Sequence, residues 1–428
     1  MGGITSHPRL RSTARPPLED EDLLSEVLLR LPPQPSSLPR ASLVCNPWRS
    51  LVADPGFLRR FRLHHRSRPP LLGFFNISYA EGSSHHIYFV PTMDRPNRLP
   101  DGPEGRFYLP ADPEDGYRAL LGCRDGLVLI LRLPWRCPEK TKTPLASWRP
   151  VLVWDPVRGD QHRIAVPLAP DDAKLSWWNN GAVLRRAGLD QFQVVLLMAE
   201  EEKQNRRLLA WIYSSETREW GYPTSTLLPS WDFLGEMAKP AVLVGNSLYW
   251  ILVGSSSSIV EFDLGTERLI VIPVPRQLHM MHRSHYSILQ ADGGGLGFLC
   301  LLKWDYKAVL YNWKTDCDGV GSWVIVRVIE LDKLLSLNEE KKYKLLCENE
   351  HKEGTGILGF AEKNNVILLK TFIGLFMFDL DSFQLKKLPR THDHIFDVHE
   401  FVHAFECVYA AGTGFGVGHG VAEVLHNA

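Results

Sequence analysis

The sequence predicts a small all-α module followed by a large all-β propeller of about six blades. Helical periodicity with repeated helix-start signals is confined to the first 66 residues. Beyond residue 70, short runs of Val, Ile, Leu and aromatic residues alternate with Gly, Asn, Asp and Pro, which is typical of strands joined by turns. We divide the chain into a flexible leader at 1–17, a helical module at 18–66, a linker at 67–70, a propeller-like domain at 71–410 and a glycine-rich tail at 411–428.

The first predicted helix carries one apolar stripe. Acidic residues stand at its beginning, where the helix dipole favours negative charge, and Pro32-Pro33 ends it. Apolar side chains recur at positions i, i+3, i+4 and i+7, which places them on one face. These residues are Leu24, Val27, Leu28 and Leu31.

Three further short helices follow. Ser36 or Ser37 can cap the second helix. Asn46-Pro47 and Asp54-Pro55 each combine a capping residue with a proline at the first helical position, and so start the third and fourth helices. Four short helices cannot bury all of their large apolar side chains among themselves. The remaining apolar surface therefore predicts a binding partner.

Five predicted strands in the second region end in the same way. Each ends in a small polar residue that can hydrogen-bond the backbone of a tight turn. Their spacing averages about 56 residues, so residues 71–428 hold about six such units. A pair of β-sandwiches is the alternative architecture. The five polar residues are Asp155, Ser214, Asp263, Asn312 and Asp379.

The helical segment resembles an F-box. The resemblance lies in the run from Asp22 to Pro32, the run from Leu38 to Cys45, and Trp48-Arg-Ser-Leu51. Many members carry two basic residues where this chain has Asn46-Pro47, which lowers the positive charge near an acidic partner. An ordinary helical cap is the alternative interpretation. The resemblance implies contact with a Skp-type adaptor, which links to a cullin scaffold, through Leu24, Leu28, Leu31, Pro32, Val44, Cys45 and Trp48.

The β region resembles the kelch-like, F-box-associated propeller of plant F-box proteins. Together the two resemblances imply a substrate-recognition adaptor of an SCF-type (Skp–cullin–F-box) ubiquitin ligase, which presents a protein substrate for ubiquitination. Such an adaptor is not an enzyme and needs no cofactor and no metal. The alternative is a propeller-based ligand- or glycan-binding protein or enzyme with the helices as a structural cap. That alternative predicts acidic, histidine or tyrosine residues converging at one mouth of the propeller, and no such set stands at matching repeat positions.

Composition limits the remaining partners and the compartment. The chain holds 48 basic and 49 acidic residues, so it lacks the long-range attraction that nucleic-acid and membrane-surface binders use. Its seven cysteines are scattered and show no CxxC spacing, which favours a reducing compartment. We find no signal peptide and no apolar run of roughly 20 residues. The sequence therefore predicts a cytoplasmic or nuclear protein.

Two local patterns have a chemical and a plain interpretation. His399 and His403 have the HExxH spacing that binds zinc on a helix. Alternation around them predicts a strand, in which residues four apart are separated by about 13 Å, too far to share one zinc ion. We therefore expect a closing strand of the propeller there. Nearer the N-terminus, a basic patch is read as a solvated helix face, with nuclear targeting or partner docking as the alternative. Its members are Arg59, Arg60, Arg62, Arg66 and Arg68. The substrate, the blade number and the way the ring closes stay open.

Overall fold

The computed structural model describes most of both predicted regions. The leader at 1–17 and the tail at 411–428 lie outside the described residues. None of the helices in the described parts is long and apolar enough to cross a membrane. The described residues are 20–77, 86–100, 105–110, 117–133, 150–167, 175–186, 191–202, 205–228, 239–252, 258–275, 285–302, 306–338, 355–389 and 401–409.

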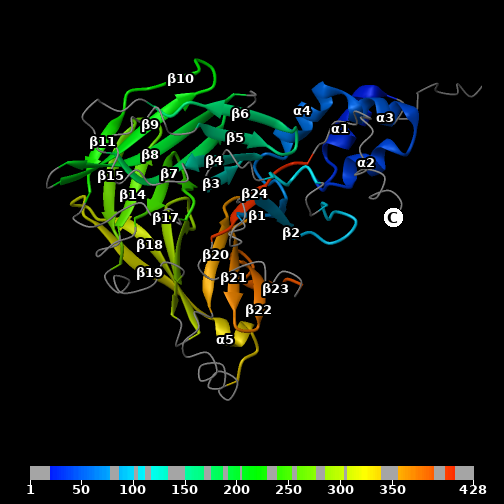
Figure 1. Ribbon diagram of the computed structural model, residues 1–428. Helices are drawn as coiled ribbons and strands as arrows, with labels where there is room; N and C mark the ends of the chain where they lie inside the picture. Colours follow the sequence, from blue (N-terminus) through cyan, green and yellow to red (C-terminus); the bar gives the residue numbers. More distant parts are fainter. Residues whose placement is uncertain are drawn as a thin grey trace, which may run out of the picture.

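Four helices form a compact module beside a β domain (Figure 1). Asp20 caps the first helix by accepting from the backbone N–H groups of Asp22 and Leu23. Asp54 caps the fourth, as predicted, and accepts from Phe57 N at 2.6 Å. The helices are α1 (Glu21–Leu29), α2 (Ser37–Ser42), α3 (Asn46–Ala53) and α4 (Pro55–His64).

The second and third helices depart from the predicted caps. Cys45 occupies the N-cap of α3, so the helix begins at Asn46 itself. Ser36 stands at the N-cap of α2 but makes no capping hydrogen bond. Its hydroxyl instead donates to Asn97 Oδ1 at 2.7 Å, because this end of α2 faces the β domain. A residue read as a local cap therefore ties the helical module to the β domain.

The buried face of α1 is rotated from the predicted one. Leu24 and Leu28 are buried as expected, and Leu29 joins them. Val27, which the predicted stripe included, is 47% exposed. The core beneath α1 also includes Val408, which belongs to the far end of the chain.

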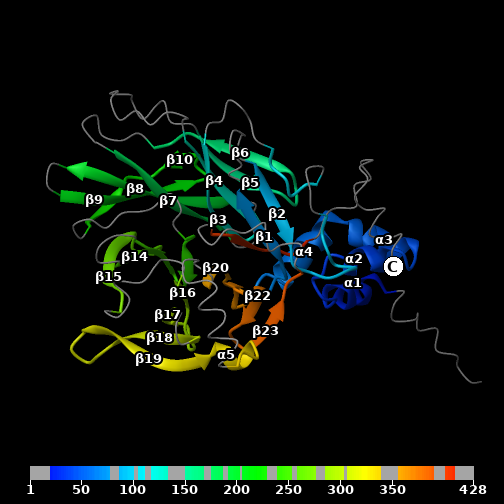
Figure 2. The same cartoon turned by 60° about the horizontal axis from the view of Figure 1, so that its bottom comes forward.

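The β region forms six antiparallel sheets in the described residues, and Figure 2 shows them around a central axis. Each is a propeller blade, which confirms the predicted fold class and excludes the sandwich alternative. From the inner strand outwards, the first blade holds β24 (His403–Glu406), β1 (Leu71–Ile77) and β2 (Ile87–Pro91), and the second holds β3 (Tyr117–Arg124), β4 (Leu127–Leu133), β5 (Val151–Asp155) and β6 (Asp160–Ile164). The third blade holds β7 (Leu175–Arg185), β8 (Phe192–Glu202) and β9 (Asn205–Ser214), with β10 (Glu219–Trp220) and β11 (Thr224–Leu227) both paired to β9. The fourth holds β12 (Val242–Val244), β13 (Ser247–Ile251), β14 (Ser258–Asp263) and β15 (Arg268–Pro273), and the fifth holds β16 (Tyr286–Gln290), β17 (Leu296–Leu302), β18 (Lys307–Thr315) and β19 (Gly321–Glu330). A short helix α5 (Leu331–Leu334) precedes the sixth, made of β20 (Gly356–Ala361), β21 (Val366–Thr371), β22 (Gly374–Asp379) and β23 (Gln384–Lys387).

Polar turn residues end the third strand of the blades, largely as predicted. Asp263 is representative, because its carboxylate accepts from the backbone N–H of Thr266 at 2.6 Å. Asn312 departs from the prediction, since β18 continues past it to Thr315. Asp316 closes that turn instead and accepts from Val320 N at 2.8 Å. The positions that end a third strand as predicted are Asp155, Ser214, Asp263 and Asp379.

One blade joins the two ends of the ring. β1 pairs on one side with β2 and on the other with β24, which follows it by more than 300 residues. The closing-strand prediction is thereby confirmed for residues 403–406, while His399 and Glu400 lie outside the described residues. Phe405 is 1% exposed and packs its ring 5.1 Å from that of Phe75. This aromatic contact fastens the C-terminal strand into the first blade.

Phe405→Ala tests how much the closing strand contributes to stability. The substitution leaves a cavity among aromatic rings, so we expect a loss of about 3–5 kcal/mol in the free energy of unfolding. Urea denaturation of the full chain measures the loss. Ile270→Ala, on the exposed face of β15, is the control and should change the midpoint little. Equal losses in the two variants would show that the closing strand contributes no more to the free energy of unfolding than an exposed position of β15 does.

Candidate functional site

Two of the predicted adaptor contacts lie inside the helical module. Leu24 and Leu28 are 3% and 0% exposed and pack against Phe57, Phe61 and Val408. Both side chains therefore lie beneath the surface of the folded module, and whether an adaptor touches them stays a prediction.

The other five predicted contacts reach the surface to different degrees. Leu31 and Trp48 are half-buried and pack against the core of the module. Pro32, Val44 and Cys45 are exposed. No observation on this chain alone tests whether an adaptor touches them, so their role stays a prediction.

Three exposed apolar side chains of the module were missed in the sequence. Leu23 and Val27 lie one turn apart on α1 and are 51% and 47% exposed, and Leu43 at the end of α2 is 58% exposed. The α1 sequence contains two stripes with a spacing of four, at 23/27 and 24/28. Periodicity alone does not say which one faces the core. We define the exposed apolar face of the module as Leu23, Val27, Leu43 and Val44.

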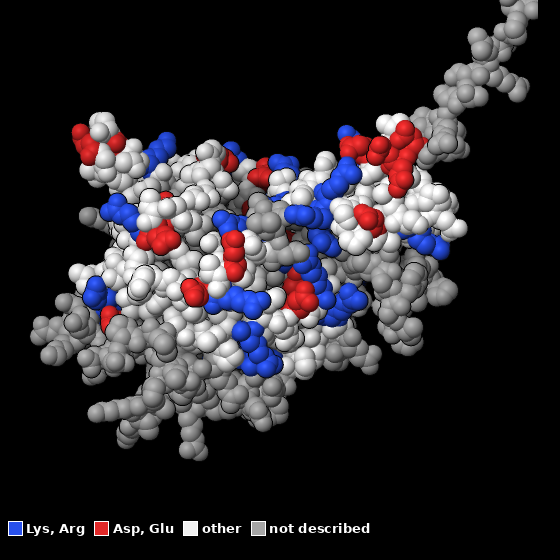
Figure 3. All heavy atoms as spheres, turned by 90° about the horizontal axis from the view of Figure 1, so that it is seen from above, with Lys and Arg blue, Asp and Glu red and all other residues white. Residues whose placement is uncertain are grey.

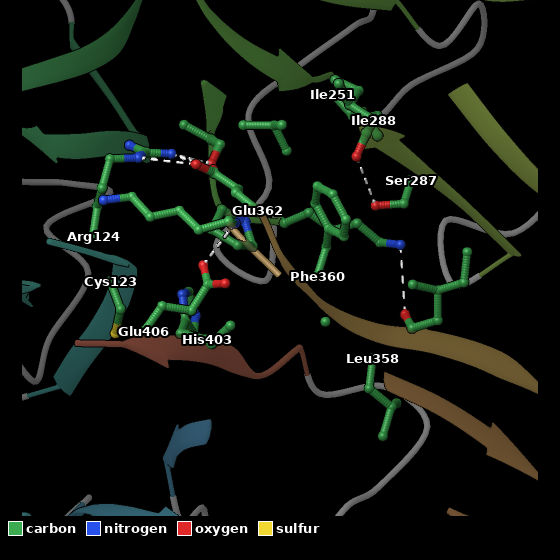
Figure 4. Close-up of a pocket in the computed structure, with 18 of the residues that line it drawn as sticks. Cys123, Arg124, Ile251, Ser287, Ile288, Leu358, Phe360, Glu362, His403 and Glu406 are labelled. Atoms are coloured by element: carbon green, nitrogen blue, oxygen red, sulfur yellow. Dashed lines mark hydrogen bonds and ion pairs between the residues drawn. The ribbon is translucent and has the colours of Figure 1, made fainter. Parts of the chain in front are cut away.

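A second candidate site lies at the propeller axis, where inner strands of several blades meet (Figure 4). It is a cavity of about 40 Å³. Arg124, at the end of β3, forms a buried ion pair with Glu362, in the turn after β20. Arg124 also donates to the carbonyl oxygen of Ala241 at 3.0 Å, and Glu362 accepts from Leu243 N at 3.3 Å. The pair therefore links three blades across the axis.

A second ion pair joins the same two turns. Lys363 pairs with Asp125, so the turn sequence Arg-Asp of one blade faces the turn sequence Glu-Lys of another. Glu406 of β24 accepts from Asn364 N at 2.8 Å and from Lys363 N at 3.1 Å. Asn364 Nδ2 then donates to the carbonyl oxygen of Pro69 at 2.9 Å, in the segment that joins the module to the propeller.

This cluster was missed because the partners of each ion pair are 238 residues apart in the sequence. In hindsight, the sequence did contain a signal for these ion pairs. Arg124-Asp125 and Glu362-Lys363 occupy equivalent turns, between the first and second strands of their blades, and carry charges in opposite order. The ligand-binding alternative predicted acidic, histidine or tyrosine residues at one mouth of the propeller; acidic residues and His403 line the cavity at the axis. Their carboxylates, however, are held in ion pairs and hydrogen bonds.

Two further groups at the axis have chemistry of interest. His403 is buried, which lowers its pKa to about 3, and its Nδ1 has no hydrogen-bond partner among the described residues. Burial raises the pKa of the Cys123 thiol well above its usual range. Near neutral pH the imidazole is therefore uncharged, and the sulfur stays a thiol rather than the nucleophilic thiolate. A cavity of about 40 Å³ has room for only a few water molecules.

Comparison with protein families gives two matches that together span both regions. A family described as "F-box protein AT5G49610-like, beta-propeller" matches residues 120–409. The F-box domain family matches residues 20–60, which include α1 to α3 and part of α4.

Two curated relatives come from Arabidopsis thaliana. An F-box/kelch-repeat protein is 24% identical over 325 residues, which is 73% of this chain and 72% of the relative. An F-box protein is 23% identical over 259 residues, or 60% of each chain.

Solved structures give only distant likenesses. A puromycin hydrolase is 14% identical with a TM-score of 0.34, covering 65% of this chain and 41% of its own. An acylaminoacyl peptidase from Pyrococcus horikoshii is 9% identical with a TM-score of 0.33, covering 75% of this chain and 50% of its own. The chain thus spans half or less of these enzymes, and such scores support no inference about activity.

His403→Leu tests the buried imidazole through the pH dependence of stability. Below the ordinary pKa of 6.5 the unfolded chain takes up a proton, whereas the folded chain does so only near pH 3. Stability is therefore lost as pH falls from about 6.5 towards 3. Between pH 7 and pH 5 we expect the wild type to lose about 2 kcal/mol more than the variant, measured by urea denaturation. Parallel losses would show that His403 does not resist protonation.

Proposed function

Since the chain belongs to the F-box proteins with an AT5G49610-like β-propeller, we propose that it is the substrate-recognition subunit of an SCF-type ubiquitin ligase. The F-box module holds a Skp-type adaptor, which links to a cullin scaffold, and the propeller holds a protein substrate. The chain itself is non-catalytic. It raises the effective concentration of substrate lysines near the transfer site, and it does so in the cytoplasm or nucleus.

The exposed apolar face of the module is the observation that carries this proposal. Leu43 and Val44 are 58% and 61% exposed at the end of α2, and Leu23 and Val27 project from α1. Branched apolar side chains on a small helical module lose contact with water when a partner covers them. In an F-box, the partner that the fold implies is a Skp-type adaptor.

The mounting of the module supports the same function. Ser36 and Gln34, before α2, both bond to the side chain of Asn97 in the propeller, at 2.7 Å and 3.0 Å. Val408 fills the core of the module from the C-terminal side. Delivery by proximity requires that the two binding partners be held in a defined relation, and these contacts hold the two domains together.

A pull-down with a purified Skp-type adaptor tests the proposal. The double variant Val27→Asp/Val44→Asp places two charges on the exposed apolar face without touching the buried core. We expect its affinity for the adaptor to fall at least about tenfold, because two desolvated contacts become charged. Biolayer interferometry with the immobilised full chain gives the dissociation constants.

The matched control is Ile270→Asp/Val326→Asp, which adds the same charge at two exposed apolar positions of the propeller. It should bind the adaptor as the wild type does. Binding by the wild type with no loss in Val27→Asp/Val44→Asp would place the docking face elsewhere, and equal loss in both double variants would show a general effect of added charge. No binding by the folded wild type would refute the adaptor role.

A further inference from the structure

Exposed apolar side chains gather on β19, the outer strand of the fifth blade. On the face shown in Figure 3, by contrast, basic and acidic side chains of the described residues lie interspersed, so charge does not single out a partner surface there. On β19 and in the turn before it, five branched side chains are between 40% and 61% exposed. We call this group the β19 edge. Its members are Val320, Val324, Ile325, Val326 and Val328.

The backbone of β19 has a strand partner on one side. Within the described residues β19 pairs with β18 and with no other strand. In an antiparallel ladder, alternate residues turn their N–H and C=O groups away from the paired neighbour. The outer side of β19 therefore offers a row of hydrogen-bonding groups to another chain. Figure 2 shows this strand at the rim of the ring, on the side away from the helical module.

The outer strands of two other blades carry a protection that β19 lacks. Charged and polar side chains at an exposed edge discourage pairing with another chain. Such side chains are Asp160, Gln161, His162 and Arg163 on β6 and Gln384, Lys386 and Lys387 on β23. The stretch of β19 from Val324 to Val328 carries Arg327 as its single charge. The centre of this edge is therefore open to a further strand.

The apolar side chains of β19 point to both faces of its sheet. Ile325 shares one face with Trp323, whose indole N–H donates to a backbone carbonyl at the end of the fourth blade at 2.7 Å. Val324 shares the other face with Arg327, whose guanidinium lies 4.4 Å from the ring centre of Phe383 in the sixth blade. A helix laid on one face would leave the other exposed. A strand added along the edge places its own side chains on both faces.

From this geometry we infer that the β19 edge binds an extended segment of another protein, which adds a strand to the fifth blade. The exposed apolar area is on the order of a few hundred Å², whereas a stable pair of subunits buries about 800 Å² on each partner. That area suits one strand and not a second copy of the propeller. A bulge at Val326 also bends the edge, so a flexible segment follows it more easily than the rigid edge of a folded domain.

The residues around the edge define the chemistry of the segment. Branched apolar side chains on both faces favour a segment with alternating β-branched residues and no proline in the paired stretch. Lys314 and Arg327 are exposed on the same face as Val324, so an acidic residue in the segment adds complementary charge. The inference stands independently of the adaptor role, because it rests on one blade alone.

A fluorescein-labelled peptide, Asp-Val-Thr-Val-Thr-Val-Thr-Val-Asp, tests the inference by fluorescence anisotropy with the full chain. Main-chain hydrogen bonds supply the affinity in strand addition, so we expect saturable binding of this generic sequence to the wild type. Ile325→Asn/Val328→Asn should bind at least about tenfold more weakly, because two apolar contacts are lost without a change in charge. The matched control, Leu227→Asn/Ile270→Asn on β11 and β15, should bind as the wild type does.

A second peptide, with proline in place of the first and third threonines, tests the backbone pairing. Proline donates no backbone hydrogen bond, so we expect no saturable binding. Equal binding of the two peptides, or equal weakening in both double variants, would mean general apolar adsorption and overturn the inference. Absence of saturable binding of the first peptide to the wild type overturns it as well. Sedimentation of the peptide-free chain as a dimer that Ile325→Asn/Val328→Asn dissociates would assign the edge to a second copy instead.

Discussion

The pairing of β1 with β24 is the constraint on which the rest of the molecule depends. Five of the six blades are continuous pieces of chain, but the remaining blade takes its inner strand from the far end. Without β24, one edge of β1 has no partner and the inner face of the first blade meets water. The inner strand of the sixth blade also packs beside β24, as Val402 N donates to Leu358 O at 3.0 Å. Closure therefore completes two blades at once.

The same short segment positions the helical module. Cys407 N donates to Pro70 O, and Val408 enters the core formed by α1 and α4. Glu406 meanwhile fixes the turn after β20 through Asn364. Successive residues thus serve the ring, the central ion pairs and the module. The charged residues at the axis pair with one another.

Local signals predicted much of this architecture, and distant contacts account for what they missed. Asp54 and the turn residues such as Asp263 act through bonds within a few residues, so the sequence reveals them directly. Ser36 has the right type for a cap, yet its hydroxyl goes to Asn97, which is 61 residues away. The core of the module includes Val408 from the far end of the chain, and the central ion pairs depend on which turns the ring brings together. Tertiary contacts of this kind leave no periodic pattern in the sequence, so the sequence alone does not predict them.

The core position of Val408 has a consequence for how the protein is made on the ribosome. The helices of the module leave the ribosome first, but the side chain that completes their core is translated more than 340 residues after α4. During that interval the nascent chain exposes apolar surface on the module and an unpaired edge on β1, both of which invite chaperones. A polypeptide truncated before residue 403 loses the ring seam and the Val408 side chain of the module core together. The ring and the core of the module are therefore completed only once residues 403–408 have been made.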